Sequence, residues 1–223
     1  CNRIRETLHL PENKIMAIYN GFSNHFQPLD NIETVTQKYI PVTGYLFFLG
    51  NTDPKKNTPR TLKAYYSYLQ QSNEKRPLLI ADLKPEFVDE MLKETGLENI
   101  RPYLYLSGYI SNTDLPFIYN GAFAFLYTSL RESFGIPLLE AMACGIPVIT
   151  SDTSSMPEIG GEGAILTDPT NERSIAAQLL LLEQDKEYYQ KQSAYGLGRA
   201  KCFSWEQTAR ELLKLYQSTV KSK

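Results

Sequence analysis

The chain has 223 residues and a formal net charge of −2, with 23 basic and 25 acidic side chains. Its length suits one large α/β domain or two small ones, and its 42% hydrophobic and 22% charged residues are typical of a globular protein. The charge balance argues against a protein that coats nucleic acid, and no apolar run approaches the roughly 20 residues that span a bilayer.

Strand-like and helix-like segments alternate along the chain. Short apolar runs that end at turn residues predict strands at 14–19, 44–49, 77–81, 103–106, 122–127, 147–150 and 163–166. Helical spacing predicts helices after residue 58, at 85–95, 115–120 and 137–144, and after Ser204. Short, uniformly apolar strands separated by helices predict an α/β fold, a three-layer doubly wound parallel sheet of Rossmann-like type. Ligands are then expected beyond the carboxyl ends of the strands.

Capping residues mark the starts of two of these helices. Thr58 is expected to cap the first one, with Pro59 in its first turn. Ser204 and Gln207 are expected to form a capping box at the start of the last one. The apolar face of that last helix is made of Trp205, Ala209, Leu212, Leu213 and Tyr216.

The cysteines do not suggest a disulfide framework. Cys1, Cys144 and Cys202 are odd in number and far apart, and no Asn-x-Ser/Thr acceptor occurs, so a reducing cytoplasm is favoured. Cys-x-x-Cys pairs, a Walker loop and a Gly-x-Ser-x-Gly elbow are also missing from the sequence. Since the chain starts at Cys1 and has no leader pattern, it is expected to be processed or cut from something longer.

The informative stretch runs from Thr128 to Pro157. Gly135 allows a close approach of backbone to a ligand, and Pro137 suits the start of a helix. The N–H groups around Gly135, Ile136 and Leu138 should then point off a helix N-terminus, which is a site for phosphate.

Local charge shows what else a phosphate would need here. From Arg131 to Glu172 the sequence has seven acidic residues and Arg131 as the one basic residue. Backbone amides must therefore attract the phosphate, helped by cations from another loop. Lys55 and Lys56 follow the strand that ends at Gly50, so the topology would bring them to the same edge of the sheet.

Two carboxylates flank this expected phosphate site. Glu132 and Glu140 are separated by seven residues, and carboxylates bind vicinal hydroxyls by accepting hydrogen bonds. A nucleoside diphosphate sugar fits, with Glu140 on the ribose and Glu132 on the sugar. Simpler explanations exist: the helix macrodipole favours a glutamate in a first turn, Glu132 can be a solvated loop acid, and Lys55 with Lys56 can be a surface pair.

Glu132, Glu140 and the following Ala141–Thr150 closely resemble the donor-site signature of the retaining glycosyltransferases of family 4, also called glycosyl transferases group 1. These are GT-B enzymes, in which two Rossmann-like domains face a cleft. The resemblance covers almost the whole chain. It implies a C-terminal donor-binding domain at 14–223, one half of a GT-B fold, preceded at 1–13 by a remnant of the N-terminal domain or a linker. Outer segments match in the family's order: 19–21, 48–50, 55–57, 107–110 and 203–206.

The resemblance also implies a role for each matching residue. Glu132 matches the acid that contacts the donor sugar, and Lys56 matches the lysine that neutralises the diphosphate leaving group, so these two are the expected catalytic residues. Phe134, Gly135 and Ile136 match the backbone that holds the distal phosphate, Glu140 matches the ribose-binding acid, and Ile110 matches the position whose backbone meets the base.

One position departs from the family pattern. Many members carry an Arg after the glycine that corresponds to Gly50, whereas this chain has Asn51. Charge compensation must then rest on Lys56, together with Lys55. A subgroup that includes many mannosyltransferases of bacterial surface polysaccharides shares this departure and resembles this chain at 54–57 and 153–158. The resemblance therefore favours GDP-mannose as donor and a function in polysaccharide or glycoconjugate biosynthesis.

Several further expectations follow from the family. No cofactor and no metal are expected, because the sequence has no Asp-x-Asp cluster. Acceptor binding and a catalytic histidine belong to an N-terminal domain, so this chain alone should bind nucleotide without turnover. Contact with the inner face of a membrane would run through that domain. Two alternatives stay open: half of a GT-B sugar-nucleotide epimerase, and a non-catalytic flavodoxin-like binding domain.

Overall fold

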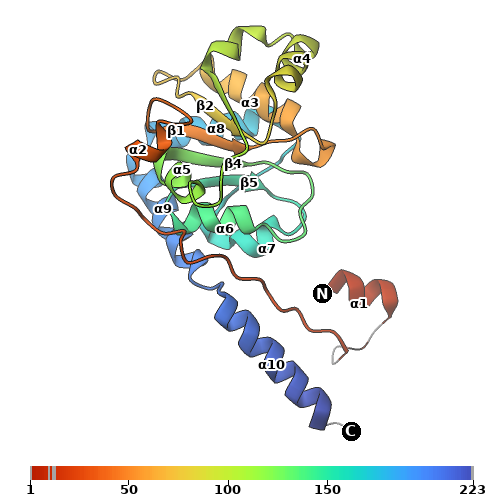
Figure 1. Cartoon of the computed structure of the whole chain (residues 1–223). Coiled ribbons are helices and arrows are strands. Elements are labelled where there is room, and N and C mark those ends of the chain that lie inside the picture. The colour runs from red at the N-terminus through yellow and green to blue at the C-terminus, as the bar shows by residue number, and fades with distance from the viewer. Residues whose placement is uncertain (1, 10, 12–13, 222–223) are drawn as a thin grey trace. The chain divides into compact units, whose positions relative to one another are not determined.

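The computed structural model describes residues 2–9, 11 and 14–221 (Figure 1). The chain divides into two units. The first combines Cys1–Ser23 with Phe203–Lys223, and the second is Asn24–Cys202. The predicted boundary between residues 13 and 14 lies beside residues 12 and 13, which are outside the described residues.

The second unit is built on a six-stranded parallel sheet in the order β3-β2-β1-β4-β5-β6. The strands are β1 (Tyr45–Leu49), β2 (Leu78–Ala81), β3 (Leu104–Gly108), β4 (Ala122–Tyr127), β5 (Val148–Ser151) and β6 (Ile165–Thr167). The chain builds outward from β1 to β3, then returns to β4 beside β1 and builds in the other direction. This is the doubly wound order, so the predicted fold class is confirmed, and its switch point lies between β1 and β4.

Helices cover both faces of this sheet (Figure 1). The α-helices of the unit are α2 (Glu33–Thr36), α3 (Thr58–Leu69), α4 (Pro85–Thr95), α5 (Leu115–Gly121), α6 (Ile136–Ala143), α7 (Met156–Gly160), α8 (Glu172–Gln184) and α9 (Lys186–Ala200). Short 3-10 turns are η2 (Pro54–Lys56), η3 (Glu98–Tyr103) and η4 (Gly161–Gly163). Helices α3, α4 and α8 pack on one face, and α5 and α6 on the other.

The alternation of β1 side chains shows why both faces are apolar. Leu46 and Phe48 point into the core with Leu62 of α3, all at most 1% exposed. Phe47 points the other way, where its ring lies 5.3 Å from the ring of Tyr119 in α5. Because successive side chains of a strand face opposite sides, a strand covered by helices on both faces is apolar throughout.

The predicted strand at 14–19 is wrong, since residues 15–23 form neither helix nor strand. Within the first unit this segment lies against the start of α10 (Trp205–Lys221). The Thr208 hydroxyl donates to the Tyr19 carbonyl at 2.6 Å, and a Cβ on Gly21 would lie 2.1 Å from the Trp205 backbone nitrogen. The segment therefore pairs with a helix, although its apolar composition suits a strand.

Two predicted helix caps differ from the structure. Asn57 is the residue that precedes α3, and the Thr58 hydroxyl donates to the Asn51 carbonyl at 2.8 Å. Ser204 accepts the Gln207 amide at 3.1 Å, but the Gln207 side chain donates to Glu211, so half of the capping box forms.

The first unit also contains α1 (Asn2–Leu8). Among the helices that the structure describes, none is both long enough and apolar enough to cross a bilayer.

Candidate functional site

Two loops meet at the switch point of the sheet, where the carboxyl ends of β1 and β4 are neighbours. Phe48 of β1 pairs with Leu126 of β4, so residues that follow these strands leave the sheet side by side. The Leu130 amide donates to the Lys55 carbonyl at 2.7 Å and joins the two loops directly. The structure thus brings together the loops that carry Lys56 and Glu132.

The loop after β1 is held in shape by its own polar side chains. Asn51 accepts the Asp53 amide at 2.9 Å, and Asp53 accepts the Lys55 amide at 3.0 Å at the start of η2. Asn57 has a left-handed backbone with φ 61°, and its buried amide group donates to the Thr128 carbonyl at 3.0 Å. Asn51, the departure from the family pattern, therefore helps to build the turn that presents Lys56.

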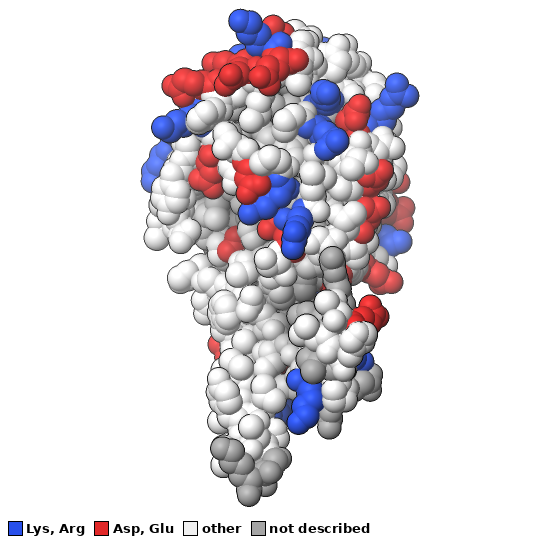
Figure 2. Space-filling view, turned by 90° about the vertical axis from the view of Figure 1, so that its right-hand side faces the viewer, with Lys and Arg blue, Asp and Glu red and all other residues white. Residues whose placement is uncertain are grey.

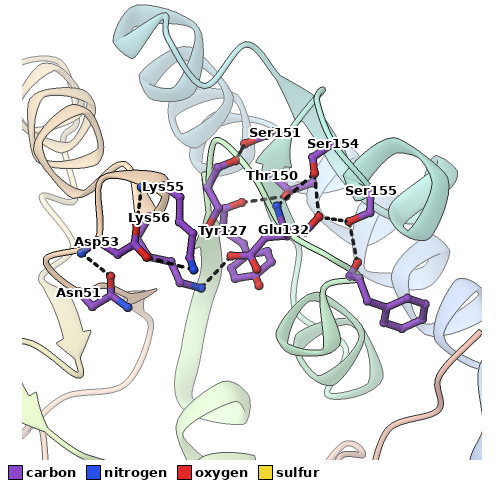
Figure 3. Close-up of polar contacts among 12 residues, drawn as sticks. Asn51, Asp53, Lys55, Lys56, Tyr127, Glu132, Thr150, Ser151, Ser154 and Ser155 are labelled. Carbon is purple, nitrogen blue, oxygen red and sulfur yellow. Dashed lines mark hydrogen bonds and ion pairs between the residues drawn. The ribbon is translucent and has the colours of Figure 1, made fainter. Parts of the chain in front are cut away.

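Lys56 and Glu132 form an ion pair at the centre of this site (Figure 3). Lys56 Nζ lies 2.7 Å from Glu132 Oε1, and the two side chains are 18% and 14% exposed. Lys56 Nζ also lies 5.4 Å from the centroid of the Tyr127 ring. Lys55 instead pairs with Asp53 at 3.0 Å and is half exposed, so the structure places it at the rim of the site.

Serine side chains from the loop after β5 fix the backbone around Glu132 (Figure 3). Ser154 Oγ donates to the Glu132 carbonyl at 2.7 Å and accepts the Glu132 amide at 3.1 Å. Ser155 Oγ lies 3.0 Å from the Glu132 carbonyl and 3.1 Å from the Phe134 carbonyl, which share its one proton. The backbone of Glu132 is thus held in place, although loop backbones are usually mobile.

The N-terminus of α6 lies directly after this loop. Gly135 precedes the helix with φ +106°, a conformation that L side chains rarely adopt, and a Cβ there would lie 2.6 Å from Met156 Cε. The Leu138 amide donates to the Gly135 carbonyl at 3.1 Å, so the expectation that it faces a ligand is wrong. Pro137 has no N–H, which leaves the amides of Gly135 and Ile136 outside the helical ladder at this end.

Glu140 lies on the second turn of α6, beyond the first turn where the helix macrodipole favours an acid. Burial raises the pKa of Glu140 to about 7, and a hydrogen bond from the Tyr119 hydroxyl, 3.3 Å from Oε2, acts in the opposite direction. Burial, with Glu140 nearby, raises the pKa of the Cys144 thiol to about 12. The Glu140 carboxyl group is therefore partly desolvated and ready to accept hydrogen bonds from a ligand.

Ile110 lies in the loop between β3 and α5 and is 4% exposed. β3 is the edge strand, so β2 and β1 separate it from β4. Helix α5, which follows this loop, carries the Tyr119 that reaches Glu140. The helix after Ile110 thus leads to Glu140, and because the Ile110 side chain is buried, its backbone is the part that a ligand could meet.

Four residues of the site were not predicted from the sequence: Tyr127, Ser154, Ser155 and Asp82. Asp82 follows β2 with φ 62°; burial raises its pKa, and the nearby Lys56 acts in the opposite direction. Their positions offered one signal: Tyr127 ends β4, Ser154 and Ser155 follow β5, and Asp82 follows β2, and every carboxyl end in a parallel sheet faces the same edge.

A cavity of about 310 Å³ opens on this edge, lined by Lys55, Arg131, Glu132 and Ser133. On the face shown in Figure 2, acidic side chains form one band near the top, and below it smaller groups of basic and acidic side chains lie next to each other. The site therefore offers a few fixed charges and a helix N-terminus, a combination suited to a small ligand that carries both phosphate and hydroxyl groups.

Comparison with known proteins shows the family of the chain. Residues 41–199 match the family model described as glycosyl transferases group 1. The O-antigen chain mannosyltransferase B of Escherichia coli is 31% identical over 220 residues, which cover 97% of this chain and 58% of that protein. This chain therefore spans less than two thirds of the length of that relative.

Solved structures show the same fold. The C-terminal domain of the glycosyl transferase group 1 family protein LpcC from Francisella tularensis aligns with a TM-score of 0.66 and 24% identity, covering 81% of this chain and 96% of that one. The Anabaena protein HepE, solved in complex with UDP, aligns with a TM-score of 0.80 and 19% identity, covering 96% of this chain and 60% of that one.

Proposed function

This chain belongs to the glycosyl transferases group 1 family, and from that premise we propose that it is the nucleotide-sugar donor-binding domain of a retaining mannosyltransferase. The donor we propose is GDP-mannose, and the product a bacterial surface polysaccharide such as an O-antigen. The names of the relatives support the sugar: O-antigen chain mannosyltransferases of Escherichia coli and Salmonella typhimurium match this chain.

One observation carries the proposal. At the switch point of the sheet, a lysine from the loop after β1 and a glutamate from the loop after β4 are paired at 2.7 Å, beside the N-terminus of α6. Doubly wound proteins bind ligands at this place. A diphosphate needs donors and positive charge, and a sugar needs an acceptor for its hydroxyls, and the site offers all three within one loop cluster.

The proposed reaction breaks the bond between the anomeric carbon and the distal phosphate oxygen. The bonding electrons leave with the diphosphate while the sugar becomes cation-like. Lys56 and the amides of Gly135 and Ile136 would stabilise the growing negative charge without reorganisation, a kind of effect worth several kcal/mol. Glu132 would bind the sugar hydroxyls, and Glu140 the ribose.

The remaining parts of the reaction are assigned to chain segments beyond this one. We propose that the acceptor, and any contact with a membrane surface, are bound by the part of the relatives that this chain does not span, since it covers 58% of the Escherichia coli protein. This chain by itself is then expected to bind donor nucleotide and to transfer no sugar.

The test is a transfer assay with the full-length protein, using radiolabelled GDP-mannose, UDP-glucose and ADP-glucose with the membrane fraction as source of acceptor. Transfer from GDP-mannose alone, and none by this chain on its own, supports the proposal. Transfer from another nucleotide sugar would refute GDP-mannose as the donor, but would still agree with the proposal that this chain is the donor-binding domain. Isomerisation of the donor without acceptor would identify an epimerase instead.

A further inference from the structure

We infer that Ser154 is a positioning residue of the donor site, whose side-chain hydroxyl holds the backbone of Glu132 in the orientation that transfer requires. The inference rests on the proposed function, because the role of Glu132 toward a donor sugar is itself proposed. Ser154 acts through Glu132 and needs no contact with the donor.

Side-chain hydroxyls continue the pairing of β4 with β5 beyond the end of the sheet (Figure 3). The two strands pair as far as Tyr127 and Thr150. From this pair onward, hydroxyls of β5 and its loop donate to successive backbone carbonyls, and we call this series the hydroxyl ladder: Thr150 to Tyr127 at 2.8 Å, Ser151 to Ser129 at 2.5 Å, Thr153 to Leu130 at 3.4 Å and Ser154 to Glu132 at 2.7 Å. Side chains therefore hold the two loops together where the pairing of the strands has ended.

Ser154 differs from the other members of the hydroxyl ladder because it bonds both backbone groups of one residue. Its Oγ donates to the Glu132 carbonyl at 2.7 Å and accepts the Glu132 amide at 3.1 Å. These two groups belong to the planar peptide units before and after Glu132, so fixing both of them restricts φ and ψ of that residue. The direction in which the Glu132 side chain leaves the backbone is therefore set by one hydroxyl.

Neither packing nor backbone conformation explains a serine at this position. Ser154 is exposed, so its side chain adds little to the core. Its φ of 62° lies in the left-handed region, which a glycine would adopt at lower cost. What serine adds over glycine here is a hydroxyl, and both hydrogen bonds that this hydroxyl makes among the described residues go to Glu132.

The orientation of Glu132 matters because its carboxylate has two tasks in the proposed site. In the free chain Glu132 Oε1 lies 2.7 Å from Lys56 Nζ. With a donor bound, the same carboxylate would accept hydrogen bonds from the hydroxyls of the transferred sugar. A small displacement of a group that positions a reactant lowers the rate, because fewer bound molecules reach the reactive geometry. Ser154 would limit such displacement before the donor arrives.

The experiment separates the hydroxyl of Ser154 from its backbone conformation, in the full-length protein. Ser154→Gly removes the hydroxyl but favours the left-handed backbone, whereas Ser154→Thr keeps a hydroxyl and adds a branched Cβ that disfavours this backbone. We expect Ser154→Gly to lower kcat/KM for GDP-mannose about 10-fold, while the affinity for GDP alone changes less than about 3-fold and Tm less than about 2 °C. Ser154→Thr should lower Tm by about 2–4 °C and keep kcat/KM within about 3-fold.

The matched control is Lys75→Gly. Lys75 has φ 46° in the loop between α3 and β2, at the amino end of the sheet, so this change relieves the same kind of backbone strain away from the site. It should leave kcat/KM within about 2-fold. A kcat/KM for Ser154→Gly within about 2-fold of the unchanged enzyme, or equal losses for Ser154→Gly and Ser154→Thr, would overturn the inference while leaving the proposed function intact. Absence of transfer from every nucleotide sugar by the unchanged enzyme would instead refute the proposed function, and this inference with it.

Discussion

Lys56 Nζ lies 2.7 Å from Glu132 Oε1, although the two residues are 76 positions apart in the chain. The contact exists because β1 and β4 are neighbours at the switch point, and each residue stands in the loop that follows its strand. The site thus holds, side by side and largely buried, a cation suited to a diphosphate and an anion suited to a sugar. Their pairing keeps both charges compensated before a ligand arrives.

Breaking this pair from one side should destabilise the fold. We expect Lys56→Met to lower the free energy of unfolding by about 1–3 kcal/mol, because Glu132 is left poorly solvated and short of a donor. The matched control is Arg101→Met: Arg101 Nε lies 2.7 Å from Asp89, but these side chains are 41% and 53% exposed. Urea denaturation should show a cost below about 1 kcal/mol for the control. Equal costs for the two changes would contradict this account of the pair.

Gly135 should tolerate no side chain. We expect Gly135→Ala to lower the free energy of unfolding by about 1–3 kcal/mol and to weaken nucleotide binding, because φ is +106° and a Cβ would contact Met156 Cε at 2.6 Å. Gly198→Ala is the control, since a Cβ there meets nothing within 4 Å in helix α9. The control should gain roughly 0.5–1 kcal/mol from helix propensity. If Gly135→Ala leaves the free energy of unfolding unchanged in thermal and chemical denaturation, the proposed strain is refuted.

Glu140 should make both stability and binding depend on pH. Its folded-state pKa of about 7 lies above the ordinary value of 4.5, so between these values the folded state holds a proton that the unfolded state has released. Stability therefore falls as pH rises through this window, by up to about 3 kcal/mol, and levels off above it. Nucleotide affinity should rise over the upper part of the window, as the ionised carboxylate becomes the better acceptor for a ribose.

The control for this prediction is Glu140→Gln, which removes the titrating group and keeps the shape. The difference between the unfolding free energies of the two proteins isolates Glu140 from every other group that titrates. A difference that stays constant from about pH 4.5 to pH 7.5 would show that Glu140 is not perturbed as described.

Nucleotide binding should not need a divalent metal. The proposed neutralisation of the diphosphate comes from Lys56 and the start of α6, so EDTA should change the dissociation constant for GDP less than about 2-fold. Titrations after chelation and after addition of Mg²⁺ or Mn²⁺ measure this directly. A 10-fold loss of GDP affinity with EDTA that Mg²⁺ restores would show that a metal ion neutralises the diphosphate.

Local sequence patterns predicted the sheet and the start of α6 but not the contacts between them. Gly135 and Pro137 identify a helix start because their effect is confined to neighbouring residues. The contact of the Lys56 ammonium group with the Tyr127 ring depends on strand order and on which face of β4 a side chain takes, neither of which a local pattern fixes. The segment Lys14–Tyr19 shows the converse case, in which a local pattern predicted a strand that does not form. Its Tyr19 carbonyl accepts a hydrogen bond from Thr208 of α10 and not from a neighbouring strand.

The predicted cap at Thr58 failed for a related reason. A threonine before a proline suits a cap, but here Asn57 precedes the helix in a left-handed backbone conformation. The side-chain amide of Asn57 donates hydrogen bonds to the carbonyls of Thr128 and Pro169, 71 and 112 positions away in the chain. Those distant carbonyls decide the conformation of the loop, and through it the place of Lys56. Local patterns therefore identified Lys56, Glu132 and Gly135 as candidates for the site, but not its four further residues or its geometry.

The most direct test of the central claim is calorimetric titration of this chain with GDP, UDP and ADP, repeated with Lys56→Ala and with Lys63→Ala as an exposed control on α3. The account predicts that GDP binds most tightly, that Lys56→Ala weakens it roughly 10- to 100-fold, and that Lys63→Ala changes it less than about 2-fold. Absence of binding for all three nucleotides, or equal affinities for the Lys56→Ala variant and the unchanged chain, would contradict the account.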